Sequence, residues 1–289
     1  MLEVDIVEDA PTFDALVRGL LEKHEPENNL FLGSLDALRK DPPASPPLMV
    51  RASDHGRTVF AAIRREPHLL VTRGTEEAIA ATAAKLAEHG AQIGAVTGPM
   101  PAAGTFATAW AQLHRRRAIV TEDERLYQLT EVSWPAPVPG AMRLIGLGDL
   151  ELATTWALAF DAEAHLVMPV RTFDQVSQLL TRRIGAGNLF GWELDNQLVA
   201  MAGLVRSTTR TIAINSVYTP PNQRGRGFAS SLVAGVTQVG LQRGKDCVVL
   251  YTDLSNPTSN SIYQKLGYRP VCEWKNYRID GPLIGSQQR

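Results

Sequence analysis

The sequence predicts a mixed α/β fold in two domains, and two observations lead to this prediction. Strand-like and helix-like hydrophobic periodicities follow one another along all 289 residues, a length typical of about two domains. Alternating prolines followed by glycine, in Trp134-Pro-Ala-Pro-Val-Pro-Gly140, indicate a semi-rigid linker near the middle of the chain. We therefore expect one domain over residues 1–133, a linker over 134–142 and a second domain over 143–289.

The composition is that of an ordinary globular protein. Hydrophobic residues make up 44% and charged residues 20%, and the formal net charge of −1 argues against a chain-wide basic surface for nucleic acid or lipid. The two cysteines, Cys247 and Cys272, fit neither a zinc site nor a disulfide framework. No signal peptide and no membrane-spanning apolar run is recognised. We expect a cytoplasmic protein that binds no metal, nucleic acid or membrane.

The first domain is expected to alternate helices and strands. Its clearest helix is Thr75–His89, which has a threonine N-cap, an acidic first turn and Gly90 as its stop. The proline-rich segment Asp41–Pro47 has too few N–H donors for regular structure and is expected to be a loop. The other expected elements are helices at 10–24, 29–39 and 103–114, and strands at 58–64, 68–72, 93–97 and 124–132.

The second domain has a more regular pattern. Asp195-Asn196 has the composition of a hairpin turn between two strands. A glycine, Gly244, ends the helix that follows the central strand. The expected helices lie at 149–160, 172–183, 228–243 and 259–266, and the expected strands lie at 189–194, 198–206, 211–218, 247–252 and 268–279.

The segment Val217–Ser230 has the features of an anion site. Two prolines end the preceding strand, and Gly225 and Gly227 allow backbone conformations that side chains would block. The next helix begins directly afterwards, and the free N–H groups of a helix N-terminus attract anions. Arg224 and Arg226 add positive charge. The segment therefore predicts a site for a pyrophosphate.

Two well-known phosphate motifs do not fit this segment. The Walker A loop requires Gly-Lys-Ser/Thr, which is absent, and the dinucleotide fingerprint requires three glycines directly after the strand. Here the third glycine is missing and Thr219–Arg224 intervenes. The pattern that remains is Arg/Gln-x-x-Gly-x-Gly/Ala, filled by Arg224, Gly227 and Ala229. An isolated Arg-Gly-Arg-Gly is equally compatible with a flexible loop, so the downstream sequence decides.

A second motif follows at Asn256-Pro-Thr-Ser-Asn-Ser-Ile-Tyr263 and continues to Gly267-Tyr268. With the glycine loop, it resembles the GNAT superfamily of N-acyltransferases over about residues 143–280. The chain looks closest to a bacterial branch of acetyltransferases that carries a degenerate GNAT-like domain in front. The resemblance implies two tandem domains, each with a mixed, mostly antiparallel twisted sheet flanked by helices, and acetyl-CoA as the acyl donor.

The resemblance also implies roles for individual residues. The backbone of Val217 and Thr219 would pair with the pantetheine arm, and the N–H groups of Gly225–Ser230 would hold the pyrophosphate. Tyr263 would protonate the thiolate as general acid, and its alternative role is that of a core tyrosine under Tyr268. The residues implied to bind the cofactor are Val217, Tyr218, Thr219, Arg224, Gly225, Arg226, Gly227, Phe228, Ala229, Ser230, Asn256 and, less directly, Asn260.

No single general base is indicated. A primary amine has a pKa near ~10.4, so deprotonating it at neutral pH costs about 4–5 kcal/mol. The carboxylates and the histidine considered for this role are Asp161, Glu163, His165, Glu193 and Asp253, and a water chain held by Asn215 and Ser216 is an alternative. We expect that no one carboxylate is essential.

The sequence thus predicts an N-acetyltransferase that passes an acyl group directly to a primary amine of a small molecule, peptide or protein. One alternative is a CoA-binding sensor or interaction protein with little turnover. Another is an RNA-binding protein that uses its Arg-Gly segment, which the neutral charge and the lack of interleaved aromatic residues disfavour. The first domain is either a decayed copy that completes the acceptor cleft or a dimerisation surface, which makes a homodimer one of the expectations.

Overall fold

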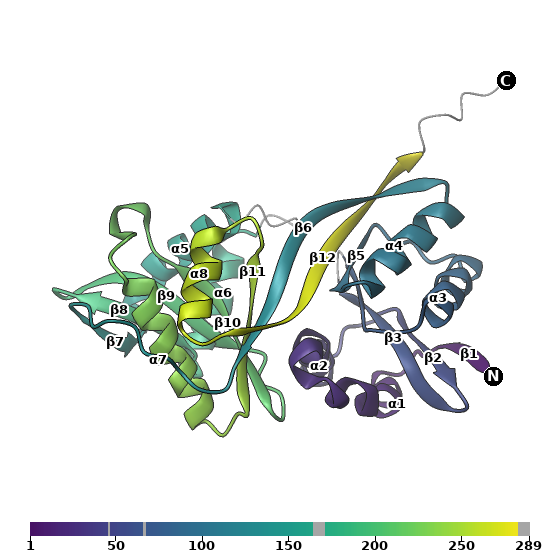
Figure 1. Cartoon of the computed structure of the whole chain (residues 1–289), viewed down its shortest axis with the longest axis horizontal. Helices are drawn as coiled ribbons and strands as arrows, with labels where there is room; N and C mark the ends of the chain where they lie inside the picture. Colours follow the sequence, from purple (N-terminus) through teal and green to yellow (C-terminus); the bar gives the residue numbers. More distant parts are fainter. Residues whose placement is uncertain (46, 66–67, 164–170, 283–289) are drawn as a thin grey trace. The chain divides into compact units, whose positions relative to one another are not determined.

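The computed structural model describes residues 1–45, 47–65, 68–163 and 171–282 (Figure 1). The chain divides into two compact units, one of Met1–Leu126 with the chain from Cys272 on, and the other of Tyr127–Val271. The expected linker at 134–142 lies inside the second unit, and the last strand of the chain belongs to the first. None of the described helices is both long enough and apolar enough to cross a membrane.

The two halves of the sequence repeat one order of elements: strand, two helices, three strands, helix, strand, helix, strand. The first half contains β1 (Leu2–Ile6), α1 (Ala10–Lys23), α2 (Glu25–Lys40), β2 (Met49–Asp54), β3 (Arg57–Arg65), β4 (His68–Val71), α3 (Glu76–Glu88), β5 (Ala95–Pro99), α4 (Ala102–Leu113) and β6 (Arg116–Leu129). The second half contains β7 (Ala141–Leu144), α5 (Leu150–Glu163), α6 (Phe173–Gly185), β8 (Leu189–Leu194), β9 (Gln197–Val205), β10 (Thr211–Tyr218), α7 (Phe228–Gln242), β11 (Cys247–Asp253), α8 (Pro257–Lys265) and β12 (Arg269–Pro282). Short 3₁₀ turns precede α5 and follow β10.

The final strand of each half is exchanged. The strands of the first unit follow the order β1-β2-β3-β4-β5-β12, and those of the second follow β7-β8-β9-β10-β11-β6. β12 pairs antiparallel with β5, joining Trp274 to Pro99 and Arg278 to Ala95. The last strand of the second half thus completes the sheet of the first unit. The last strand of the first half, β6, is next to β11 in the strand order, and its residues up to Leu126 belong to the first unit.

Within these sheets the pairing is mostly antiparallel. β4 and β10 are parallel to β5 and β11 respectively. The antiparallel pairs are β1–β2, β2–β3, β3–β4, β5–β12, β7–β8, β8–β9 and β9–β10. The mixed, mostly antiparallel sheet flanked by helices that the sequence predicts is confirmed.

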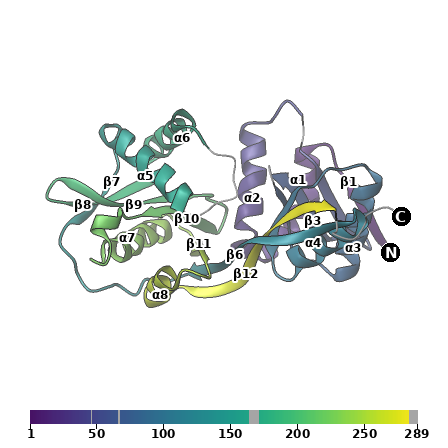
Figure 2. The same cartoon turned by 90° about the horizontal axis from the view of Figure 1, so that it is seen from above.

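Helices cover both faces of the sheet in the second unit (Figure 2). On one face, Leu204 and Ile214 of the sheet pack with Leu232 of α7 and Leu266 of α8 in a cluster of buried apolar residues. On the other face, a second cluster joins α5 and α6 to β8, β9 and the end of β10, where Tyr218 lies. Successive side chains of a strand point to opposite faces of the sheet, so one strand contributes residues to both clusters.

The predicted elements differ from the observed ones mainly at short strands. β1, β2 and β7 are not predicted, and the strand expected at 124–132 begins earlier, at Arg116. The turn at Asp195-Asn196 is confirmed, because both residues have the positive φ angles, 49° and 61°, of a tight hairpin turn. The described part of the proline-rich segment 41–47 contains no helix or strand, as expected.

Candidate active site

β10 and β11 are paired only at their beginnings. The register joins Thr211–Ala213 to Cys247–Val249, and no further pairing between the two strands occurs in the described part of the chain. On its other side, β10 has a bulge after Asn215, with Ser216 at a φ of 55°. The second half of β10 thus turns unpaired backbone groups toward the side of β11. An extended ligand can pair with such an edge.

An uncapped helix end follows this strand. Gly225 and Gly227 have φ angles of 75° and 81°, in the left-handed region that favours glycine. Gly227 is the N-cap of α7, no side chain caps it, and the first turn holds no acidic residue. The N–H groups of Phe228–Ser230 therefore have no acceptor within the helix, and they add to the partial positive charge of its N-terminus. Such a helix end attracts an anion.

The corresponding junction in the first unit is closed. α3 follows β4 as α7 follows β10, but Thr75 caps it by accepting a hydrogen bond from the backbone N–H of Ala78 at 3.2 Å, and two glutamates occupy its first turn. β4 and β5 also stay in contact at Gly98: a Cβ added to this glycine would lie only 2.5 Å from Cγ2 of Val71 on β4. A capped and acidic helix end disfavours a phosphate. Of the two junctions, the second is the one that fits an anion.

Arg224 lies beside this helix end and is bound to the protein itself. Its Nη2 donates to Glu163 at 2.6 Å, and its Nε donates to the carbonyl of Thr219 at 2.8 Å. Its guanidinium lies 5.8 Å from the ring centroid of Tyr218, whose hydroxyl donates to Glu163 at 3.1 Å. Burial, and then the hydrogen bond to Glu163, raise the pKa of Tyr218. Nη1 of Arg224 has no partner among the described residues, whereas Nη2 and Nε are already engaged.

Arg226 is held in the loop in a different way. Its Nη1 donates to the side-chain oxygen of Gln223 at 2.7 Å, and its guanidinium lies 4.7 Å from the ring centroid of Phe228. Because no carboxylate in the described residues forms an ion pair with it, its charge remains available to an anion at the start of α7.

The two asparagines of the downstream motif have different surroundings. Asn256 is the exposed N-cap of α8, and its side-chain oxygen accepts from the N–H of Ser259 at 3.0 Å. Asn260 donates to the carbonyls of Asp253 and Asn256, both at 2.8 Å, and accepts from the hydroxyl of Tyr127 at 3.0 Å. Asn260 therefore holds α8 against the end of β11, whereas the NH₂ group of Asn256 has no partner among the described residues. The partner Tyr127, on an exchanged strand, is not indicated by the sequence.

Tyr263 lies in the apolar core of the second unit. It is 8% exposed, and its ring centroid is 5.9 Å from that of Tyr268 at an angle of 68°. The hydroxyl of Tyr268 is bonded to Thr237 at 2.7 Å, but that of Tyr263 makes no hydrogen bond to any described residue. Burial raises the pKa of Tyr263 to about 12. A phenol with this pKa stays protonated at neutral pH.

The candidate general bases are already engaged by neighbouring groups. His165 lies outside the described residues. Three of the carboxylates form ion pairs: Asp161 with Arg171, Glu163 with Arg224, and Glu193 with Arg143. The carboxylate of Asp253 accepts a hydrogen bond from the backbone N–H of Ser255. The side-chain oxygen of Asn215 accepts from the N–H of Ser216. No carboxylate among these residues stands out as a base by its surroundings.

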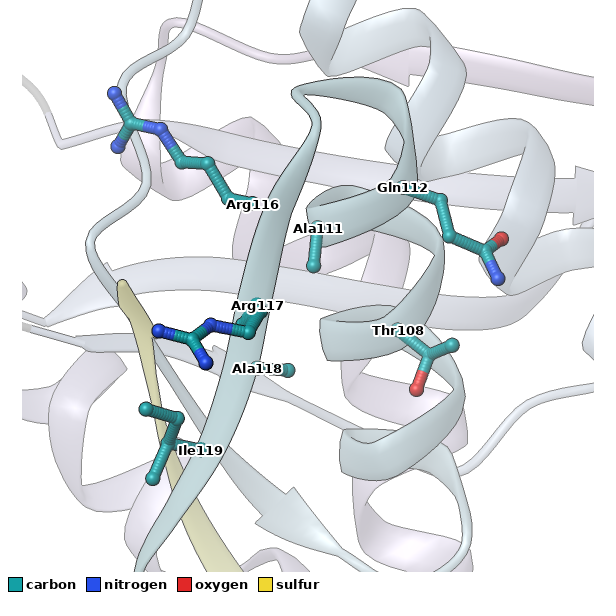
Figure 3. Close-up of a pocket in the computed structure, with 7 residues that line it drawn as sticks. All are labelled: Thr108, Ala111, Gln112, Arg116, Arg117, Ala118 and Ile119. Atoms are coloured by element: carbon teal, nitrogen blue, oxygen red, sulfur yellow. The ribbon is translucent and has the colours of Figure 1, made fainter. Parts of the chain in front are cut away.

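Two surface pockets lie in different units. One, of about 320 Å³, is lined by Thr108, Ala111, Gln112, Arg116, Arg117, Ala118 and Ile119 on α4 and β6 (Figure 3). The guanidinium groups of Arg116 and Arg117 point away from Thr108 and Gln112 there. The other, of about 480 Å³, is in the second unit and borders the loop before α7 at Pro220, Asn222 and Gln223. The described residues contain no group of histidine, cysteine and acidic side chains able to hold a metal ion.

Comparison with known proteins agrees with this geometry. Residues 155–268 match the family model of the acetyltransferase (GNAT) family. A thialysine N-epsilon-acetyltransferase from Sus scrofa is 29% identical over 80 residues, which are 27% of this chain and 47% of that enzyme. The match thus spans about half the length of this curated relative.

Two solved structures are similar over nearly the whole chain. A GCN5-related N-acetyltransferase from Sphaerobacter thermophilus superposes with a TM-score of 0.61 at 19% identity, covering 97% of this chain and 98% of that one. A tandem GNAT protein from the clavulanic acid biosynthesis pathway has a TM-score of 0.55 at 15% identity, covering 98% and 100%. The fold is therefore that of a tandem GNAT protein. The residues that match the family model all lie within the second unit.

Proposed function

We propose that this protein is an acetyl-CoA-dependent N-acetyltransferase that transfers the acyl group directly to a primary amine in a ternary complex. The observation that carries the proposal is the separation of β10 from β11 beside the uncapped N-terminus of α7. The pantetheine arm pairs with the free edge of β10 at Val217 and Thr219, and the pyrophosphate binds the N–H groups of Gly225–Ser230. This arrangement uses a strand edge and a helix end for the two chemically different parts of one cofactor.

The reaction needs three contributions from the chain. The amine nitrogen, after losing a proton to water or a nearby base, forms a bond to the thioester carbon, and the carbon–sulfur bond breaks. A backbone N–H near Val217 stabilises the negative charge on the carbonyl oxygen. The sulfur leaves as a thiolate and takes the proton of Tyr263, which then regains one from solvent. No covalent intermediate with the protein is formed.

The helix end is tested by introducing into the first turn of α7 the acidic residue that α3 has at the same position. Glu77 occupies the second position of α3, and Ala229 occupies the second position of α7. We expect Ala229→Glu to weaken acetyl-CoA binding at least tenfold by calorimetry, because a carboxylate there repels the pyrophosphate. Gln242→Glu, which adds the same charge at the opposite end of α7, serves as the matched control and should leave the affinity within about twofold.

Turnover is tested by thiol release from acetyl-CoA with a panel of primary amines. Release that depends on an amine supports the proposal. Binding of acetyl-CoA without release, under every acceptor, favours a CoA-binding sensor instead. No heat of binding with acetyl-CoA at near-physiological salt contradicts both.

The role of the first unit stays a prediction. Its capped and acidic α3 supports a decayed copy that does not bind the cofactor. A homodimer through this unit predicts a doubled mass in light scattering, which a monomeric mass contradicts. The cytoplasmic location likewise stays a prediction.

A further inference from the structure

Arg183, on α6, is a partly buried cation without a carboxylate partner in the part of the chain that the structure describes. Its guanidinium has one hydrogen bond, from Nη1 to the hydroxyl of Ser216 at 3.3 Å, and no carboxylate among the described residues forms an ion pair with it. A guanidinium carries five N–H donors, and buried charges in proteins are normally paired. Burial, and then the nearby charges of Arg171 and Arg206, lower the pKa of Arg183 to about 10.

The position of Arg183 relates it to the acyl group. Ser216 lies in the bulge of β10, directly before Val217, whose backbone we place beside the thioester. Val217 packs toward the α7 side of the sheet, whereas Tyr218 packs among α5 and α6. Because Ser216 bonds to a residue of α6, its hydroxyl lies on the α5–α6 side. Arg183 thus stands on the face opposite α7, one residue from the proposed reaction centre.

The surroundings of Arg183 are positively charged. Arg171 is neutralised by Asp161, to which its Nη2 donates at 2.5 Å. Arg206 lies 5.9 Å from the ring centroid of Tyr251, on the strand next to β10. Arg171 and Arg206 thus add positive charge near Arg183, and the nearby carboxylate of Asp161 is already paired with Arg171. A single guanidinium binds a carboxylate or a phosphate through two parallel N–H bonds.

We propose that the amine acceptor carries an oxyanion, a carboxylate or a phosphate, and that Arg183 binds this group. The inference rests on the proposed function and names the class of its acceptor. The oxyanion would accept hydrogen bonds from the N–H groups of Arg183 that have no partner among the described residues. It would thereby orient the amine of the same molecule toward the thioester. Alkylamines without an oxyanion would leave the buried charge unpaired.

The experiment compares acceptors that differ only in the oxyanion. The pairs are lysine against cadaverine, γ-aminobutyrate against propylamine and glycine against methylamine, with aminopropylphosphonate to tell a phosphate site from a carboxylate site. The variants are Arg183→Met, Arg183→Lys and the control Arg182→Met, which removes an exposed charge from the same helix. Each is assayed for kcat and KM separately, for acetyl-CoA affinity by calorimetry and for its urea midpoint.

We expect the full-length protein to prefer the anionic member of at least one pair by tenfold or more in kcat/KM. Arg183→Met should reduce that preference to about twofold, through KM, because a hydrogen-bonded charge contributes roughly 10- to 100-fold to affinity. Arg183→Lys should restore part of it, and Arg182→Met should behave as the unchanged protein. The urea midpoint of Arg183→Met should not fall, since an uncompensated buried charge is removed.

Equal use of the paired acceptors, or a preference that survives in Arg183→Met, overturns the inference while the proposed acetyl transfer stands. A lowered urea midpoint with unchanged KM assigns Arg183 a structural role and also overturns it. Direct titration of lysine and cadaverine into the protein gives a readout without turnover. Binding of lysine that is lost in Arg183→Met supports the oxyanion site even if acetyl-CoA does not bind, which would contradict the proposed function alone.

Discussion

Glu163, the last residue of α5, forms an ion pair of 2.6 Å with Arg224 in the loop before α7. The two residues are 61 positions apart in the sequence, and the hydroxyl of Tyr218 bonds to the same carboxylate. The arginine expected to contact the pyrophosphate is therefore already bound to a carboxylate. A phosphate that binds Nη2 of this arginine competes with Glu163.

Removing the carboxylate should therefore tighten cofactor binding. We expect Glu163→Gln to lower the dissociation constant of acetyl-CoA about three- to tenfold, because it frees Arg224 and removes a negative charge near the anion site. Glu151→Gln, in the exposed first turn of the same helix, should leave the constant unchanged. Calorimetry at two salt concentrations measures both, and weaker binding by Glu163→Gln would show that Glu163 positions Arg224 rather than competes for it.

The two loop glycines should differ in how much they tolerate a side chain. Both have left-handed backbones, but a Cβ at Gly227 would lie 2.9 Å from Cγ1 of Val138, whereas one at Gly225 would meet nothing within 4 Å. We expect Gly225→Ala to cost about 1 kcal/mol of unfolding free energy from backbone strain alone, and Gly227→Ala roughly 1 kcal/mol more. Urea unfolding measures both losses, and equal losses contradict the contact with Val138.

The two asparagines should separate binding from stability. Asn260→Ala removes three side-chain hydrogen bonds, but each of the three groups keeps a second partner, so we expect a loss of about 1–2 kcal/mol of unfolding free energy. Asn256→Ser keeps a helix cap and should cost less than about 0.5 kcal/mol, yet it removes the NH₂ donor and should weaken acetyl-CoA binding several-fold. If Asn256→Ser leaves the affinity unchanged, Asn256 is a cap and nothing more.

The two neighbouring tyrosines should separate catalysis from packing. We expect Tyr263→Phe to lower kcat by about 10²–10³ while the acetyl-CoA affinity and the urea midpoint stay nearly unchanged, because its hydroxyl has no bond to lose. Tyr268→Phe removes the hydrogen bond to Thr237 and should cost about 1 kcal/mol of stability without a loss of kcat. Steady-state kinetics and urea unfolding test both variants, and an unchanged kcat in Tyr263→Phe rejects the general-acid role.

Alkaline pH should destabilise the protein through Tyr263. Its pKa in the folded chain is about 12, above the value near 10 of an exposed tyrosine, so the folded state favours the protonated phenol. The resulting stability is fully present below pH ~10 and is lost as the pH rises toward ~12, at up to about 1.4 kcal/mol per pH unit. Urea unfolding at pH 8 to 11 should show a shallower decline in Tyr263→Phe. The same decline in both proteins contradicts the raised pKa.

Much of the second unit is predictable because its signals are local. Hydrophobic periodicity locates β8 to β11 and α7, and the glycines and prolines of the loop before α7 mark a backbone that few other residues adopt. The short strands β1, β2 and β7 are not predicted, since a strand of a few residues carries too little periodicity to distinguish it from a loop.

The exchange of β6 and β12 has no signature in the sequence. An exposed strand with alternating residues fits next to either β5 or β11, and the choice depends on the backbone path of the whole chain. The family resemblance already implies two tandem domains, but the element-by-element match of the two halves is visible only in the structure, because the halves share a fold rather than a pattern of residues.

By itself, the sequence determined the glycine loop, the Asn256 to Tyr268 motif and hence the class of chemistry, because each depends on residues that are near neighbours in the chain. The tertiary structure alone decided which groups those residues meet. It brought Arg183 to Ser216 across 33 positions and paired Glu163 with Arg224. It also showed that one of two similar helix ends is capped, because the charge and solvation of a side chain depend on neighbours that only folding assembles.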